Sequence, residues 1–140
     1  MPQHYIFFPV LSLVVLTFGI AIWMAKLRFV AVRRGDIDGR FFKLNRGGEP
    51  PEYLVKVSQN YDNLLEIPIL FYALCGFLYM TGQVEPAQLI LAWVFVISRY
   101  VHSYVHTVRN KLMLRLQVFI FGFTVLGAMW CLFLARLIRM

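Results

Sequence analysis

Two long apolar runs without charge constrain this chain more than any other feature. Residues 5–25 and 116–135 contain no charged side chain. An apolar helix of about 20 residues is long enough to cross the hydrocarbon core of a bilayer. The whole chain is 60% hydrophobic and only 15% charged, which leaves too little polar surface for a soluble domain of this length. The sequence therefore predicts an integral membrane protein in contact with membrane lipids.

Two further apolar segments, residues 57–82 and 86–108, complete a set of four predicted spans. Their hydropathy is interrupted by a few polar residues, and the connection between them near residue 85 is very short. Such a short connection makes the two helices antiparallel neighbours. We predict an all-α fold, a four-helix bundle that forms a single transmembrane domain over residues 1–140. The expected spans are residues 5–25, 57–82, 86–108 and 116–135.

The cationic residues gather in two of the connections. The segment 26–56 holds eight of the fourteen Lys and Arg residues, and the segment 109–115 adds Arg109, Lys111 and Arg115. Cytoplasmic loops of membrane proteins carry an excess of cations, so both connections are expected in the cytoplasm and both termini outside. The net charge of +7 thus reflects membrane topology, and no nucleic-acid partner is predicted.

Polar side chains form one stripe on each of the two central spans. They recur at steps of three and four residues, which places each set on one helix face. Charged groups in the hydrocarbon cost a few kcal/mol unless they are paired or hydrated, so the stripes should face the bundle interior or a cavity. The stripe on the second span comprises Gln59, Asp62, Asn63 and Glu66, and that on the third comprises Arg99, His102, His106 and Asn110.

The two stripes are expected at the same depth. Counting an equal rise per residue from the turn near residue 85 places Glu66 level with the stretch between His102 and His106. One interpretation is a buried pair that only fixes helix register. Another is a metal site, because His102 and His106 are four residues apart and Glu66 would complete three ligands. A hydrogen-bonded polar stripe is the commoner arrangement, and no metal ligands are predicted.

The motifs on these two spans resemble those of a known family. They are Asn63-Leu64-Leu65-Glu66-Ile67-Pro68, then Phe71, and Arg99-Tyr100-Val101-His102 through to Arg115. Together with the four spans they resemble the MAPEG family, the membrane-associated proteins in eicosanoid and glutathione metabolism. The likeness covers roughly residues 55–125 and is closer to uncharacterised bacterial members than to the eicosanoid synthases.

The resemblance implies a homotrimer in a bacterial inner membrane, with glutathione held between neighbouring subunits on the cytoplasmic side. It implies a glutathione-dependent transferase or peroxidase acting on lipophilic electrophiles or peroxides. Arg115 matches the catalytic arginine that stabilises the glutathione thiolate in enzymatic relatives, a role that a fixed cation can perform. The implied glutathione-binding residues are Asn63, Glu66, Arg99, His102, His106, Arg109 and Lys111.

Three positions depart from the pattern of the relatives. Gln59 and Asp62 stand where glutathione-using relatives commonly carry arginine, and His106 replaces a tyrosine that is common in the third-helix stripe. Arg109, Lys111 and Lys56 are the candidates to compensate for the missing carboxylate-binding charge. The alternative function is a non-catalytic membrane scaffold, or an accessory subunit of a larger membrane complex, with a degenerate glutathione site.

Overall fold

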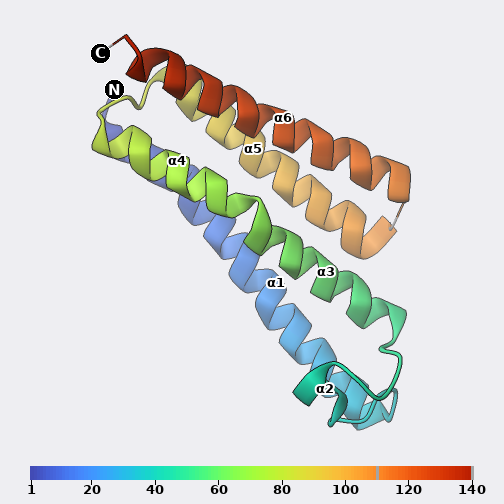
Figure 1. The fold of residues 1–140 in the computed structure, drawn as a ribbon. Helices are drawn as coiled ribbons and strands as arrows, with labels where there is room; N and C mark the ends of the chain where they lie inside the picture. The colour runs from blue at the N-terminus through green and yellow to red at the C-terminus, as the bar shows by residue number, and fades with distance from the viewer. Residues whose placement is uncertain (110, 140) are drawn as a thin grey trace.

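Four long helical stretches contain the four apolar segments (Figure 1). The computed structural model describes residues 1–109 and 111–139, and the regular structure within these ranges is all helical. Each stretch is long and apolar enough to cross a membrane, which confirms the predicted all-α membrane fold. The elements are η1 (Gln3–Ile6), α1 (Phe7–Arg34), α2 (Phe41–Leu44), α3 (Glu52–Glu66), α4 (Pro68–Met80), α5 (Pro86–Tyr104), the π-helical turn η2 (Val105–Arg109) and α6 (Leu112–Leu137).

The helices on either side of the first connection extend beyond the apolar spans. Helix α1 continues to Arg34, and α3 begins at Glu52, so the connection is residues 35–51 instead of 26–56. Gly35 ends α1 in the left-handed conformation, with φ of 75°, which glycine adopts at little cost. Pro51 has extended backbone and precedes the first turn of α3. Hydropathy describes the apolar part of each helix, whereas Gly35 marks the end of α1 and Pro51 precedes the start of α3.

The helices run up and down, so both termini lie at one end of the bundle together with the α4–α5 turn (Figure 1). The segment 35–51 and the start of α6 lie at the other end. The closest packing is between α5 and α6 and between α1 and α3. The two cation-rich connections thus share one end of the molecule, because successive helices run in opposite directions.

The centre of the bundle is apolar, and so is much of its outer surface. Phe71 of α4 and Phe95 of α5 are fully buried and stack with their ring centroids 4.7 Å apart. In contrast, Phe29 is 75% exposed and Met80 is 80% exposed. A soluble protein does not present so many large apolar side chains to water, whereas lipid or a neighbouring subunit can cover them.

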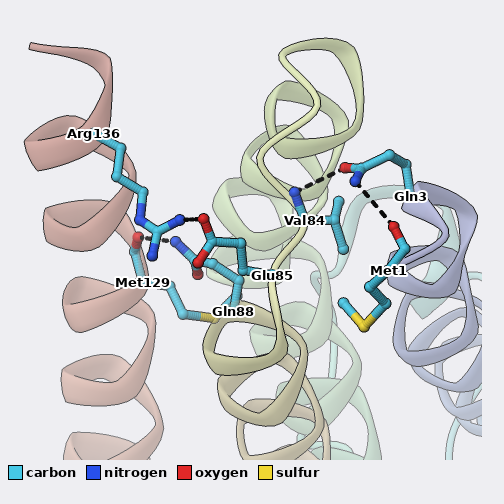
Figure 2. Close-up of polar contacts among 7 residues, drawn as sticks. All are labelled: Met1, Gln3, Val84, Glu85, Gln88, Met129 and Arg136. Carbon is cyan, nitrogen blue, oxygen red and sulfur yellow. Dashed lines mark hydrogen bonds and ion pairs between the residues drawn. The ribbon is translucent and has the colours of Figure 1, made fainter. Parts of the chain in front are cut away.

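Polar contacts fasten the α4–α5 turn at the end that carries the termini (Figure 2). The backbone N–H of Val84 donates to Gln3 Oε1 at 2.9 Å, and Glu85 forms an ion pair with Arg136 of α6. Gln88 is buried one turn into α5, and its Nε2 donates to a backbone carbonyl of α6 at 3.1 Å. These contacts fix the turn to both the first and the last helix.

A second small cluster orders the segment 35–51 against α1 and α3. Buried Ile37 packs with the adjoining residues of both helices. Tyr53 Oη donates to Asp36 Oδ2 at 2.7 Å, and the guanidinium of Arg28 lies 5.4 Å from the ring centroid of Phe42. The connection is therefore tied to the helices by both apolar and polar contacts.

Candidate functional site

A cleft opens between α3, the α5–η2 stretch and the first turns of α6. It has a volume of about 550 Å³, which lies within the usual range of small-molecule sites. Its walls combine the polar stripes of two helices with apolar residues of α6. The lining residues are Gln59, Asp62, Asn63, Glu66, His102, His106, Leu112, Met113, Arg115, Leu116 and Phe119.

The α3 wall of the cleft is the predicted polar stripe. Asp62 and Glu66 are exposed toward the cleft, and neither forms an ion pair with another described residue. Asn63 Nδ2 donates to the backbone carbonyl of Gln59 at 2.9 Å, which leaves the Asn63 Oδ1 free to accept a hydrogen bond. This wall thus presents two carboxylates and an amide oxygen to any ligand, and it favours a cationic group.

A break in the helix lies directly beside Glu66. Helix α3 ends at Glu66, and Pro68 is the first residue of α4. Proline has no N–H to donate to the carbonyl four residues earlier, so it interrupts the hydrogen-bond ladder there. The break places Glu66 at the last position of a helix.

The wall formed by α5 and η2 contains two buried histidines. His102 is 3% exposed and His106 is 1% exposed, and their ring centroids are 5.7 Å apart. His106 lies in η2, where the backbone changes from α-helical to π-helical hydrogen bonding. A π-helical turn accommodates an extra residue and changes the direction in which the following side chains point, and such turns are frequent at functional sites.

Arg115 supplies the cationic group of the cleft. It lies near the start of α6 and is half-buried, and its Nη1 is 3.3 Å from His106 Nε2. This contact joins α6 to η2 across the cleft. Among the described residues that line the cleft, Arg115 is the one arginine or lysine.

Arg99 does not line this cleft. It is 1% exposed, and its Nη2 donates to the backbone carbonyls of Val118 and Phe119 on α6 at 3.5 and 3.3 Å. Its guanidinium also lies 5.3 Å from the ring centroid of Phe95 and 5.6 Å from that of Phe119. Arg99 therefore joins α5 to α6, and it reaches the interface between them because Gly122 leaves space there.

The remaining candidates from the sequence fall outside the cleft. Arg109 and Lys111 are exposed near its rim and do not line it. Asn110 lies outside the described residues. The three-ligand metal set is not assembled, because no group of three His, Cys, Asp or Glu side chains within residues 1–109 and 111–139 is arranged to hold a metal ion.

One polar residue near the site was not predicted from the sequence. Asn60 is completely buried, and neither atom of its side-chain amide has a hydrogen-bond partner among the described residues. Ser103 Oγ and His106 Nδ1 are also buried without such a partner. Asn60 was missed because it lies one residue, about 100° around the helix, from Gln59 in the stripe. An isolated amide between Gln59 and Tyr61 gave no periodic signal.

The fold and the cleft together define a class of protein: a four-span membrane protein whose polar site lies between its helices. The sequence model of the MAPEG family matches residues 6–135, and the chain belongs to this family. No curated protein and no solved structure matches the chain.

Proposed function

We propose that this MAPEG protein is a glutathione-dependent transferase or peroxidase that acts on lipophilic electrophiles or peroxides. The observation that carries the proposal is the cleft itself. It joins a carboxylate and an amide of α3, Glu66 and Asn63, to the His106–Arg115 pair within helices long enough to span a membrane.

The residues of the cleft suit parts of the tripeptide. Glutathione supplies a thiol nucleophile, an ammonium group and two carboxylates. Glu66 is placed to accept hydrogen bonds from the ammonium, since it has no ion-pair partner among the described residues. Arg115 is a fixed cation that favours the ionised form of a nearby thiol, which is the reactive one. Arg109 and Lys111, exposed near the rim, supply charge for the carboxylates.

The apolar side of the cleft suits a substrate that arrives from the membrane. Leu112, Met113, Leu116 and Phe119 of α6 form this side. A lipophilic electrophile or peroxide partitions into the bilayer and can approach Arg115 along this surface. The same residues exclude water from the thiolate, which strengthens its interaction with the cation.

The test is the ultraviolet absorbance of a thiolate when glutathione is added to the purified protein. We expect a thiolate signal in the native protein and its loss in Arg115→Ala, with binding heat still measurable by calorimetry. Arg139→Ala is the matched control, because Arg139 follows the last residue of α6 and does not line the cleft. The absence of both a thiolate signal and binding heat in the native protein would refute the proposed activity.

We also propose that three copies assemble in a bacterial inner membrane with the cleft facing the cytoplasm. The cation-rich ends and the exposed apolar helix faces support this arrangement. Native mass spectrometry in mild detergent tests the trimer. Labelling of an engineered cysteine in segment 35–51 by a membrane-impermeant reagent tests the orientation, and reaction in intact cells would contradict it.

A specific observation favours the alternative function, a non-catalytic scaffold or accessory subunit. Gln59 and Asp62 line the cleft, so its described residues include two carboxylates against one arginine. A ligand with two carboxylates is repelled by Asp62. If repulsion by Asp62 prevents glutathione binding, the double variant Gln59→Arg, Asp62→Asn should bind glutathione. A larger partner that is retained in stoichiometric amount in mild detergent would support the scaffold role.

A further inference from the structure

The contact between His106 and Arg115 has a defined direction. A guanidinium carries five N–H donors and no acceptor. In the 3.3 Å contact between Arg115 Nη1 and His106 Nε2, the arginine must therefore donate and the imidazole nitrogen must accept. An imidazole that accepts at Nε2 is neutral and carries its proton on Nδ1. The pair thus requires one particular tautomer of His106.

Arg115 depends on this contact for its position. Its side chain has many rotamers, and it lies in the first turns of α6 on an open cleft. The bond to His106 is its one polar side-chain contact among the described residues. His106, by contrast, is 1% exposed and held in η2, so its ring has little freedom to move.

We propose that His106 is a positioning residue that holds Arg115 in the cleft by accepting a hydrogen bond through Nε2. The inference rests on the proposed function, in which Arg115 stabilises the thiolate. His106 itself exchanges no proton with the thiol. It keeps the guanidinium on the cleft wall, where the charge is needed, instead of leaving it free to turn toward water.

The Nδ1 proton needs an acceptor inside the protein. His106 Nδ1 is buried without a partner among the described residues, and so is Ser103 Oγ one turn earlier on the same stretch of helix. The two groups form no direct hydrogen bond with each other. A water bridging them would accept from Nδ1 and donate to Ser103 Oγ, which would favour the tautomer that Arg115 requires.

The arrangement makes the cleft sensitive to acid. The charged or titratable groups that share it with His106 are Asp62 and Glu66 of α3, His102 of α5 and Arg115 of α6. Protonation of His106 turns Nε2 into a donor and adds a positive charge beside Arg115, so the bond is lost. The hold on Arg115 is therefore lost as His106 becomes protonated.

The first experiment needs no ligand. Nitrogen-15 NMR of histidine-labelled protein in nanodiscs distinguishes the two neutral tautomers, and His106 is assigned from the signal absent in His106→Gln. We expect the tautomer with Nδ1 protonated in the native protein and a mixture in Arg115→Ala. A native His106 with its proton on Nε2 would overturn the proposal, whatever the protein does with glutathione.

The second experiment measures the thiolate absorbance with bound glutathione. His106→Gln keeps an amide oxygen that can accept from Arg115, and it should retain the signal. His106→Leu should lose it while still binding glutathione, and the acid loss of signal should occur at higher pH in the native protein than in His106→Gln. Equal thiolate signals in His106→Leu and the native protein, or identical acid profiles in the native protein and His106→Gln, would overturn the positioning role.

The two experiments separate the two proposals. If the native protein shows no thiolate at all, the proposed function fails, and the NMR result still decides whether His106 holds Arg115. If His106→Leu does not fold, as judged by circular dichroism, the acid profiles of the native protein and His106→Gln decide the question.

Discussion

Replacing Gly122 with alanine tests how Arg99 is accommodated between α5 and α6. An ideal Cβ at Gly122 would lie 2.1 Å from Arg99 Nη2 and 2.6 Å from Ser98 Oγ. Ordinary contacts between heavy atoms are about 3.5–4.0 Å. Arg99 is 1% exposed and Ser98 is 4% exposed, so neither group can move toward solvent. The added methyl group must therefore displace the guanidinium from the two carbonyls to which it donates.

The expected cost follows from two opposing effects. Overpacking a buried site costs about 1–3 kcal/mol, whereas replacing glycine with alanine inside a helix gains about 0.5–1 kcal/mol. Gly122→Ala should therefore lower the free energy of unfolding by up to about 2.5 kcal/mol, and by about 1–3 kcal/mol relative to a glycine-to-alanine change without a steric clash. Gly127→Ala is the matched control, because it lies on the same helix and has no neighbour within 4 Å of its added Cβ. Gly127→Ala should show only the stabilisation of about 0.5–1 kcal/mol that alanine gives over glycine inside a helix.

The assay is reversible unfolding of each variant in mixed micelles with a rising fraction of denaturing detergent, followed by circular dichroism. The difference between the two alanine variants isolates the steric cost at Gly122. Arg99→Ala combined with Gly122→Ala should recover part of that cost, since it removes the displaced group. If Gly122→Ala is as stable as Gly127→Ala, the close packing of Arg99 against α6 is refuted.

Three further changes test other parts of the structure. Pro68→Ala restores an N–H at the α3–α4 break, so hydrogen–deuterium exchange at the junction should slow, and unchanged exchange would argue against a proline-induced break. Tyr53→Phe removes the 2.7 Å bond to Asp36, and we expect a loss of about 0.5–1.5 kcal/mol with faster proteolysis in segment 35–51. Proteolysis at the native rate would contradict the anchoring role of that bond. Glu85→Gln removes a partly exposed ion pair with Arg136, which should change stability by less than about 1 kcal/mol and only at low salt. A much larger effect would mean that the pair is shielded from water.

The convergence of the two polar stripes was predictable because it depends on helix periodicity, rise per residue and the length of the connecting turn. Helical periodicity places Asn63 and Glu66 on one face and His102 and His106 on another. A short turn fixes the two helices as antiparallel neighbours, and the constant rise per residue fixes relative depth. These rules require no knowledge of side-chain contacts, and the cleft contains all four residues.

The placement of Arg99 was not predictable in the same way. Helical spacing puts it on the same stripe as His102, but a long side chain extends well beyond its own Cβ. Its guanidinium reaches α6 because Gly122 leaves a space there. Helical periodicity predicts the position of a Cβ atom, whereas contacts with the opposing helix determine the position of the end of a long side chain.

The π-helical turn also gave no signal in the sequence. Residues 105–109 follow on from an ordinary helix, and nothing in their composition marks the change of hydrogen bonding at η2. The helices also extend beyond the predicted spans, because the arginines near the end of α1 favour both water and helix formation. Patterns of polarity report the surroundings of a helix, and only local contacts report its length.

The position of the two chain termini has a practical consequence. Both lie at the end of the bundle that carries the α4–α5 turn, whereas the start of α6 lies at the other end (Figure 1). The cleft is lined by the first turns of α6 and so lies toward that other end. An affinity handle or a fluorescent protein fused to either terminus is kept away from the cleft by the length of the bundle. The protein can therefore be immobilised by either end, with the cleft left accessible to ligands in solution.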